Sequence, residues 1–269
     1  MSNIIAITGG GSGMGLAIAE RLAPNYHVVI CGRTEEKLKN AVEQIRERGN
    51  EADYMVCDIS NEENVKRFAA YARSFGEIKG VVNCAGLSPH LGTSNEIVLT
   101  NAMGTIYVDE AFRNVMEAGS CIINFSSNAG HMLDEEDYYD DCDDDREAFL
   151  DSLLSQVNET AEGIARCNVA YMHSKTFVIW YTKSHGAEYG EKGIRLLSIS
   201  PGTYDTPMAH AELPLSMAAV NAFAAVKRIG KPTEMAALVE FVLSEDAAYL
   251  TSVDILMDGG TQSGQGIYK

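Results

Sequence analysis

The chain has 269 residues, enough for one large hydrophobic core, and its apolar residues are spread evenly, so we expect a single domain. Its formal net charge of -17 argues against binding to nucleic acid or to anionic membrane surfaces, because both require a basic face. The six cysteines contain no C-x-x-C pair and are expected to be reduced, and we find no leader and no membrane-spanning apolar run, which predicts a soluble cytoplasmic protein.

A glycine-rich segment follows the first apolar run of the chain, Asn3 to Thr8. Apolar residues at helical spacing resume directly after it, so the order is that of a strand, a tight turn and a helix. Glycines let the backbone approach a ligand, and the unpaired N–H groups at a helix N-terminus attract phosphate. The pattern T-G-x-x-x-G-x-G from Thr8 to Gly15 therefore predicts a dinucleotide site. Its spacing differs from the usual fingerprint, and a purely structural turn is the alternative.

The second expected strand, His27 to Gly32, ends where the ribose of a dinucleotide would lie. An acidic residue at this place would bind the 2′-hydroxyl of NAD(H). Here Gly32 is followed by Arg33, which removes the repulsion of a 2′-phosphate and adds a guanidinium able to bind it. The sequence therefore favours NADP(H) over NAD(H), with a solvated charge at the strand end as the alternative for Arg33.

Strands and amphipathic helices continue to alternate, which predicts right-handed crossovers and a parallel sheet. The expected elements are a helix over Thr34–Arg48, a strand over Ala52–Cys57, a helix over Asn61–Phe75 and a strand over Gly80–Cys84. Asp58 lies just past the third strand, where its carboxylate could accept from an adenine amino group or cap a helix. The fourth strand runs into Asn83-Cys84-Ala85-Gly86, whose small residues would let the backbone lie against a flat cofactor.

Two polar residues interrupt the next two elements. A long helix expected over Glu96–Glu117 carries Asn101 among apolar neighbours, and a buried polar side chain needs a partner, whether structural or functional. The fifth strand, Cys121–Phe125, is followed by Ser127, whose hydroxyl would lie at the carboxyl end of the sheet, where ligands bind in open α/β folds. For Ser127 taken alone, a turn serine is the commoner use of such a residue.

Residues 128–167 form the one break in composition along the chain. The segment Asp134–Glu147 is almost wholly acidic, so we expect it to be solvated and poorly ordered. Apolar residues at helical spacing follow and predict an amphipathic helix that docks on the domain by one face. These residues are Phe149, Leu150, Leu153, Leu154, Val157, Ala161 and Ile164. We therefore interpret residues 128–167 as an acidic and helical insertion.

Tyr171 and Lys175 lie four residues apart in the chain, a spacing that places both side chains on one face of a helix. A phenol has a pKa of about 10 and is a useful base near neutrality only when a nearby cation stabilises its anion. At about 4 Å and an effective dielectric constant of about 20, Lys175 would supply about 4 kcal/mol of attraction before desolvation is subtracted. The pair is therefore a candidate for proton transfer, with a chance pairing on one helix face as the alternative.

The remaining apolar runs complete the predicted sheet. The expected elements are a sixth strand over Ile194–Ser200, a last helix opening at Lys231-Pro232-Thr233 and a seventh strand over Val253–Met257. Residues 203–227, which include Met208 and Met217, suggest a substrate flap, although core packing is the commoner use of such residues. The sequence thus predicts one doubly wound α/β domain over residues 1–269, a Rossmann fold with seven parallel strands. No metal is expected, because no His/Cys cluster has ligand spacing.

In this order the motifs resemble those of the short-chain dehydrogenase/reductase family over nearly the whole chain. They are TGGGSGMG at Thr8–Gly15, Asp58, NCAG at Asn83–Gly86, Asn101, Ser127, YMHSK at Tyr171–Lys175, PGTYDT at Pro201–Thr206 and a late DGG. The resemblance implies that Tyr171 is the catalytic acid/base and that Lys175 lowers its pKa and binds the cofactor ribose. It also implies that Ser127 binds the reacting oxygen and that Asn101 holds a water in a proton relay.

The same resemblance implies the cofactor contacts. Asp58 is expected at the adenine, and Thr206 is expected at the nicotinamide carboxamide. The full set of expected cofactor-binding residues is Gly9, Ser12, Gly13, Met14, Gly15, Arg33, Asp58, Asn83, Ala85, Gly86, Tyr171, Lys175, Pro201, Gly202 and Thr206.

Two departures from the family pattern affect this interpretation. Ser127 and Tyr171 are much further apart than usual, so the insertion must loop outward, and the stretch from Gly86 to Asn101 is short. With these features and the segment after Pro201, the chain is similar to bacterial 3α-hydroxysteroid dehydrogenase/carbonyl reductases. We therefore expect NADP(H)-dependent interconversion of a secondary alcohol and a ketone, with a hydroxysteroid or bile acid as substrate. The alternatives are a reductase of oxoacyl thioesters and a non-catalytic NADPH-binding sensor.

The insertion also bears on assembly. In the family that the chain resembles, the helices bearing Tyr171 and Asn101 commonly pack against a neighbouring subunit. The added helix must bury its apolar face, and the nearest apolar surface is this one, so it should either replace the usual contact or become part of a new one. Acidic segments facing each other would repel. We expect a homodimer with the acidic segment at its periphery, and a tetramer is the alternative. The expected ligand is a small apolar carbonyl or alcohol, with no nucleic-acid or membrane partner.

Overall fold

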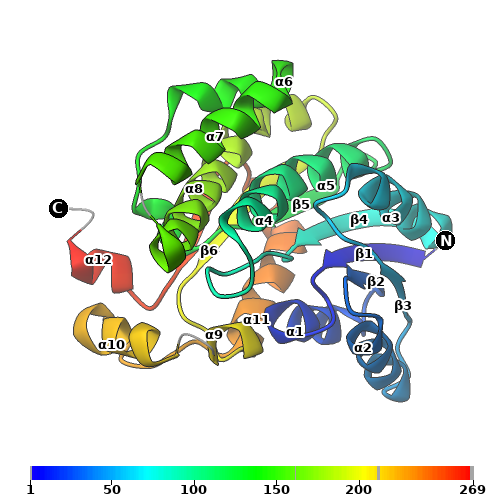
Figure 1. The fold of residues 1–269 in the computed structure, drawn as a ribbon. Helices are drawn as coiled ribbons and strands as arrows, with labels where there is room; N and C mark the ends of the chain where they lie inside the picture. The colour runs from blue at the N-terminus through cyan, green and yellow to red at the C-terminus, as the bar shows by residue number, and fades with distance from the viewer. Residues whose placement is uncertain (1, 161, 211–212, 267–269) are drawn as a thin grey trace.

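Seven parallel strands form one sheet in the order β3-β2-β1-β4-β5-β6-β7 (Figure 1). The strands are β1 (Ser2–Thr8), β2 (His27–Gly32), β3 (Ala52–Val56), β4 (Gly76–Asn83), β5 (Cys121–Phe125), β6 (Arg195–Pro201) and β7 (Asp254–Met257). The computed structural model describes residues 2–160, 162–210 and 213–266. Because the chain builds outward from β1 in one direction and then crosses to β4, the predicted doubly wound Rossmann sheet is confirmed.

Helices cover both faces of the sheet. The longer ones are α1 (Gly13–Leu22), α2 (Glu35–Glu47), α3 (Glu62–Phe75), α5 (Gly104–Arg113), α7 (Arg146–Thr160), α8 (Gly163–Gly190), α10 (Leu213–Phe223) and α11 (Pro232–Leu243). The shorter ones are α4 (Ser94–Val98), α6 (Asp141–Asp144), α9 (Pro207–His210) and α12 (Thr261–Gln265), with 3₁₀ turns at Asn128–His131, Asp137–Asp140 and Glu245–Ala247. Helices α1, α2 and α11 pack on one face, and α3, α5 and α8 pack on the other (Figure 1). Among the described helices, none has the length and apolar character that a bilayer crossing requires.

The central strand β1 is buried on both of its faces. Ile5 and Ile7 lie in the core beneath α1, α2 and α11, whereas Ile4 and Ala6 lie in the core beneath α3 and α5. Side chains of a strand alternate between the two faces of a sheet, so all four residues must be apolar. Polar side chains are consequently tolerated where the strands end, and this concentrates ligand-binding chemistry at the carboxyl edge.

The helix expected over Glu96–Glu117 is divided into α4 and α5 by a π-helical turn, Leu99–Met103. Thr93 and Glu96 form a capping box at the start of α4. The backbone stays helical from Ser94 to Arg113, so the predicted helix is confirmed, whereas the sequence revealed neither the π-helical turn nor the end at Arg113. Asn101 lies within this turn and is buried.

Strand β4 begins at Gly76, four residues before the start predicted at Gly80. The extension was not predicted from the sequence, because Glu77 and Lys79 are charged and charged residues are rare in buried strands. The two side chains form an ion pair with each other. The paired charges lie near the N-terminal end of the strand, away from the carboxyl edge.

The acidic segment Asp134–Glu147 is more ordered than the sequence predicts. It contains a 3₁₀ turn and α6, and the side chains of Tyr139 and Cys142 within it are fully buried. Tyr139 lies edge-on against Phe177 of α8, with the ring centroids 5.3 Å apart. The expectation of a solvated segment is therefore wrong for these two side chains, because both face α8 and α7. Most of the carboxylates around them are exposed, as expected.

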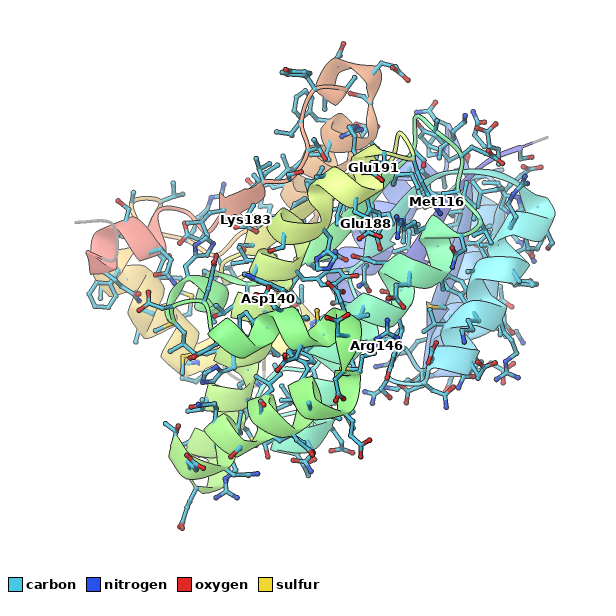
Figure 2. The ribbon with its side chains drawn as sticks, turned by 90° about the horizontal axis from the view of Figure 1, so that it is seen from above. Met116, Asp140, Arg146, Lys183, Glu188 and Glu191 are labelled. Carbon is cyan, nitrogen blue, oxygen red and sulfur yellow. The ribbon has the colours of Figure 1, made fainter. Side chains whose placement is uncertain are left out.

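Helix α7 lies along α8, and Figure 2 shows this arrangement with Arg146 on the side of α5. A hydrophobic core lies between α7, α4 and α8. Helix α7 contributes to it the fully buried side chains of Phe149, Leu153 and Val157 and the partly buried side chains of Leu150 and Leu154. Ala161, which the sequence assigned to the same helix, lies outside the described residues. Ile164 belongs to α8, where it is 51% exposed. The end of the interval 128–167 is therefore continuous with the helix that bears Tyr171.

Candidate active site

The turn between β1 and α1 requires glycine. Gly9 (φ 69°) and Gly13 (φ 58°) adopt backbone angles that L-residues rarely adopt. A Cβ atom at Gly15 would lie 2.4 Å from the carbonyl oxygen of Gly9, and a Cβ atom at Gly9 would lie 3.0 Å from the backbone of Ala85. The turn therefore packs directly on the end of β4, and the N-terminus of α1 faces the space above the sheet edge.

A groove runs along the carboxyl ends of β1 to β4, and we call it the dinucleotide groove. Of the residues expected to bind the cofactor, it is lined by Gly9, Ser12, Gly13, Met14, Gly15, Arg33, Asp58, Ala85, Gly86 and Thr206. The sequence interpretation missed other lining residues, namely Cys57, Ile59, Leu87, Thr100, Pro207 and Met208. The groove suits a dinucleotide, because side chains at its glycines would fill the cradle and the helix N-terminus attracts phosphate.

Arg33 and Asp58 both lie in this groove, at the ends of β2 and β3. The Asp58 carboxylate accepts hydrogen bonds from the N–H and the hydroxyl of Ser60, at 3.0 and 2.8 Å. Asn61 caps α3 by accepting from the N–H of Asn64 at 2.9 Å, so the alternative of Asp58 as the helix cap is wrong. The Arg33 side chain is exposed at the groove, where an anionic ligand would meet its guanidinium.

A second cavity adjoins the groove at the ends of β5 and β6, and Ser127 and Tyr171 both line it. The other predicted residues that line it are Met14, Pro201, Gly202 and Thr206. Met14, Thr206 and Met208 line both spaces, so the cavity and the groove meet at these side chains. The chain thus places a cavity with two hydroxyl groups next to a glycine-lined groove.

The predicted flap, residues 203–227, borders the second cavity through its first part. Thr203, Tyr204, Met208 and Ala209 line the cavity. The hydroxyl of Tyr204 donates to the carbonyl oxygen of Met257 at 3.2 Å, which ties the base of this segment to β7. Residues 211–212 and the side chains of Leu213, Leu215 and Ser216 lie outside the described part of the chain.

Lys175 is buried beneath the junction of the two spaces. Its ammonium donates to the carbonyl oxygen of Phe125 at 2.7 Å and lies 5.9 Å from the centroid of the Tyr171 ring. Burial lowers the pKa of Lys175 to about 8. A Cβ atom at Gly86 would lie 3.5 Å from the ammonium, so glycine keeps the groove open directly above it.

Asn101 connects the π-helical turn to the neighbouring loop and to α8. Its Oδ1 accepts from the N–H of Leu87 at 2.8 Å, and its Nδ2 donates to the carbonyl oxygen of Leu87 at 3.0 Å and to the hydroxyl of Ser174 at 3.2 Å. The Ser174 hydroxyl in turn donates to the carbonyl oxygen of Tyr171 at 2.9 Å. The sequence interpretation missed Ser174, although it stands inside the YMHSK motif.

Ser127 stands at the end of β5, where the strand passes into a 3₁₀ turn. Its hydroxyl accepts from the N–H of Ala129 at 3.1 Å and donates to Oδ1 of Asn128 at 3.3 Å. The adjacent Ser126 also lines the cavity, and its hydroxyl donates to the carbonyl oxygen of Lys175 at 2.7 Å. Ser127 therefore has the contacts of a turn serine and also lines the second cavity.

Asn83 lies behind the groove, and its side chain does not line it. Its Oδ1 accepts from the hydroxyl of Thr8 at 2.8 Å, and its Nδ2 donates to Asn124 at 3.2 Å. Asn124 in turn donates a hydrogen bond to the buried carboxyl group of Asp109 at 2.6 Å. Thr8 also accepts from the N–H of Ala85 at 3.0 Å, so these buried polar groups fix the loop that borders the groove.

Burial raises the pKa of Asp109 to about 8. The sequence interpretation missed this residue and Asn124, although both are polar residues within otherwise apolar elements. The sequence has no His/Cys cluster with ligand spacing, but among the described residues the fold brings one group of potential metal ligands together. These are Cys142 and Asp143 of the insertion and His185 of α8, which lie outside the two spaces described above.

Two family models match the chain and together span most of it. A model described as short chain dehydrogenase matches residues 3–136, and one described as enoyl-(acyl carrier protein) reductase matches residues 153–262. The residues between the two matches, 137–152, fall in the insertion.

Individual relatives match over most of their length. The uncharacterized oxidoreductase YxbG of Bacillus subtilis is 30% identical over 94% of this chain and 89% of its own. The short-chain reductase protein NovJ of Streptomyces niveus is 29% identical over 96% and 93%. An actinorhodin polyketide ketoreductase solved with NADPH superposes with a TM-score of 0.74 at 24% identity over 97% of each chain. The chain belongs to the short-chain dehydrogenase/reductase family of oxidoreductases.

Proposed function

We propose that the protein is an NADP(H)-dependent enzyme that interconverts a secondary alcohol and a ketone. One arrangement carries the proposal: Ser127 and Tyr171 line a cavity that meets the dinucleotide groove, and the Lys175 ammonium lies 5.9 Å from the Tyr171 ring. A nicotinamide bound in the groove would supply or accept the hydride. The residues of the chain would position the substrate oxygen and move the proton.

In the direction of reduction, Tyr171 donates its hydroxyl proton to the substrate carbonyl oxygen as the carbon receives the hydride. Ser127 donates a hydrogen bond to the same oxygen and stabilises the charge that develops there. Lys175 stabilises the tyrosine anion that remains, which is neutralised by a proton from solvent. We assign Asn101 to the relay of this proton, because it bonds to Ser174 within the YMHSK motif. Oxidation follows the same path in reverse.

The preference for NADP(H) over NAD(H) rests on Arg33. The residue lies at the end of β2 in the groove and leaves its guanidinium exposed there. A guanidinium can bind a 2′-phosphate with two charge-assisted hydrogen bonds, and the preceding Gly32 presents no carboxylate to repel it. A solved short chain dehydrogenase from Burkholderia cenocepacia that superposes with a TM-score of 0.75 holds NADP, which agrees with this choice.

For the substrate we place oxoacyl thioesters and related ketones first. NovJ is named a short-chain reductase, and the actinorhodin enzyme is named a polyketide ketoreductase. The hydroxysteroid expectation rests on the resemblance of the sequence and gains no support from these relatives. The second cavity is lined by four methionines, Met14, Met132, Met172 and Met208, and by the polar residues Ser88, Asn128 and Asn168, so a substrate with an apolar chain and further oxygens suits it.

A spectrophotometric panel tests the proposal. Oxoacyl thioesters, simple ketones, hydroxysteroids and bile acids are offered with NADPH and with NADH, or with the oxidised cofactors for the alcohols. We expect reduction of oxoacyl thioesters with NADPH, and loss of that activity in Ser127→Ala. Activity confined to the hydroxysteroids and bile acids would show that these, and not oxoacyl thioesters, are the substrates. Tight NADPH binding without turnover of any member would favour the sensor alternative and contradict the enzyme proposal.

A further inference from the structure

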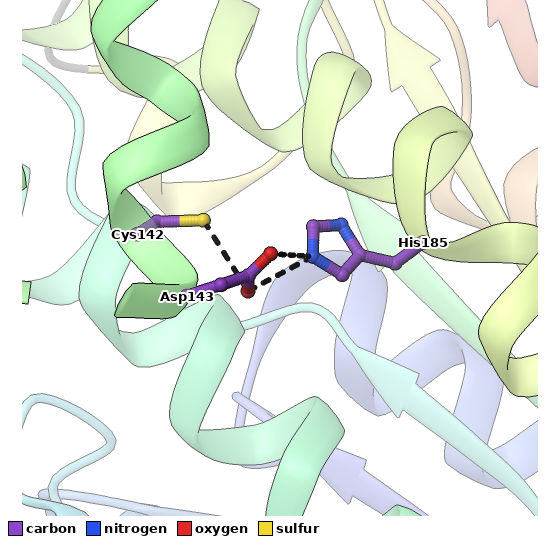
Figure 3. A group of neighbouring side chains, drawn as sticks. All are labelled: Cys142, Asp143 and His185. Carbon is purple, nitrogen blue, oxygen red and sulfur yellow. Dashed lines mark hydrogen bonds and ion pairs between the residues drawn. The ribbon is translucent and has the colours of Figure 1, made fainter. Parts of the chain in front are cut away.

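A compact group of three potential metal ligands joins the insertion to the catalytic helix. Cys142 and Asp143 belong to α6, and His185 belongs to α8 (Figure 3). The His185 Nε2 atom lies 3.0 Å from each carboxylate oxygen of Asp143, and the Cys142 sulfur lies 3.7 Å from Asp143 Oδ1. One donor atom from each of the three residues falls within 4.8 Å of the others.

The imidazole of His185 is held in the orientation that metal-binding histidines adopt. Its Nδ1 lies 2.8 Å from the carbonyl oxygen of Tyr181, and because a carbonyl only accepts, Nδ1 carries the hydrogen. This leaves Nε2 directed at Asp143 and Cys142. A hydrogen bond from the other ring nitrogen to a backbone carbonyl is the usual support of a histidine ligand. The Tyr181 ring stacks on the imidazole at 4.0 Å and fixes its plane.

We propose that Cys142, Asp143 and His185 bind a Zn²⁺ ion, with water as the fourth ligand. Zinc bonds of about 2.0 to 2.3 Å in a tetrahedron place neighbouring ligand atoms about 3.3 to 3.7 Å apart. The observed separations are 3.0 Å between His185 and Asp143 and 3.7 Å between Cys142 and Asp143, and all three donor atoms lie within 4.8 Å of one another. Thiolate and imidazole ligands select zinc over Mg²⁺ and Ca²⁺, which prefer oxygen. The Asp143 side chain is 54% exposed, so solvent reaches the fourth position, whereas Cys142 and His185 are buried.

The surrounding charges favour a cation at this place. Asp140, Asp141, Asp144 and Asp145 flank the two ligands of α6 and are exposed. The nearby Arg146 bonds to Glu110 of α5. Without a metal, burial and the carboxylate of Asp143 raise the pKa of the Cys142 thiol, so metal binding must release its proton to solvent. An ion pair between protonated His185 and Asp143 is the alternative for the same geometry.

Such a site would fasten the insertion to the helix that carries Tyr171 and Lys175. The ligands of α6 precede the apolar face of α7 in the chain, and His185 lies ten residues after Lys175 on α8. The metal would thus stabilise the packing of α6 and α7 on α8 without contact with either the groove or the second cavity. Its expected effect is on stability, and the test therefore does not depend on turnover.

Zinc content provides the first test. The full chain, purified without a metal-binding tag, is incubated with zinc sulfate, dialysed against metal-free buffer and measured by plasma mass spectrometry. We expect close to one zinc per chain in the unmodified protein and a loss of at least about tenfold in Asp143→Asn and in His185→Gln. The matched controls Asp141→Asn and Cys167→Ser should retain the metal. Zinc should also raise the midpoint of thermal unfolding in the unmodified protein and not in Asp143→Asn.

Cobalt provides a test of the thiolate ligand. Co²⁺ in place of zinc should give a thiolate-to-metal charge-transfer band that Cys167→Ser retains and Cys142→Ser loses. Because Cys142 is buried, circular dichroism must first show that Cys142→Ser is folded. If this variant does not fold, the zinc content of Asp143→Asn, a substitution at an exposed position, decides whether the site binds metal. Equal zinc content in the unmodified protein and Asp143→Asn would overturn the proposal and leave an ion pair between His185 and Asp143.

Discussion

The ammonium of Lys175 lies 5.9 Å from the centroid of the Tyr171 ring, one helical turn along α8. Burial lowers the pKa of this ammonium to about 8, so it is still mainly protonated at pH 7. We expect a cation at this place to favour the anion of the phenol, and this role of Lys175 stays a prediction. The carbonyl oxygen of Phe125 accepts from the ammonium and keeps it from turning away.

Tyr171→Phe should abolish proton transfer while leaving the groove intact. The variant removes one hydroxyl at the edge of the second cavity, and loss of a positioned acid/base lowers the rate by about 10² to 10⁴ fold. We expect kcat to fall by at least that factor, whereas the affinity for NADPH, followed by fluorescence, changes little. Near-normal turnover in this variant would show that another group moves the proton.

Arg33→Ala should separate the two cofactors. If Arg33 binds the 2′-phosphate, its removal weakens NADPH binding by about 1.5 to 3 kcal/mol, the worth of a hydrogen bond to a charged group, and leaves NADH nearly unchanged. The matched control is Lys39→Ala, an exposed cation of α2 that does not line the groove. Isothermal titration with both cofactors measures the difference, and equal losses for NADPH and NADH would refute the contact.

The fold was predictable because its elements are short and strongly patterned. Runs such as Ile4–Ile7 are continuously apolar since they are buried on both faces of the sheet. The motif residues at the carboxyl edge followed from their positions just after these runs, and Asn83 is the exception, because its side chain turns inward to Thr8 and Asn124. The position of a residue along a strand does not determine which group its side chain forms a hydrogen bond with.

Contacts between distant segments could not be read from the sequence. The group formed by Asp143 and His185 spans 42 residues of chain, and no local spacing signals it. The burial of Tyr139 in an acidic run depends on the face that α8 presents, which is a property of the assembled core. The resemblance supplied the roles of Tyr171 and Ser127, and their shared cavity required the structure.

Asp109→Asn should change how stability depends on pH. The pKa of the buried Asp109 is raised to about 8, so the folded chain holds a proton there that the unfolded chain, with a pKa of about 3.9, releases. The contribution is fully present below about pH 4 and is lost as the pH rises through 8. Urea denaturation at pH 5 and pH 8 should show the variant gaining stability relative to the unmodified protein by about 4 kcal/mol at the higher pH.

Asp246→Asn is the control for this comparison, because Asp246 is an exposed carboxylate on the surface. Its difference from the unmodified protein should be the same at both pH values. The prediction for Asp109 is contradicted if Asp109→Asn shows no relative gain between pH 5 and pH 8.

Phe149→Ala should measure how firmly the insertion is docked. The ring of Phe149 is fully buried and lies 4.6 Å from the ring of Phe177 on α8, measured between centroids. Truncation of a buried phenylalanine costs about 3 to 5 kcal/mol of unfolding free energy. Ile164→Ala, at a half-exposed position of α8, should cost far less. Equal and small losses in both variants would mean that α7 contributes little to the stability of the domain.

The apolar face of α7, formed by Phe149, Leu153 and Val157, packs on α4 and α8. If a neighbouring subunit used these same helices, as the family resemblance implies, α7 would block that contact. The large exposed side chain of Phe241 lies on α11, whose buried side chains share a core with Ile255 and Met257 of the edge strand β7. We expect a homodimer through this edge, and Phe241→Asp should yield monomers in light scattering coupled to size exclusion, whereas Ile164→Asp should not. A stable tetramer at both low and high ionic strength would show that the insertion does not block the shared face.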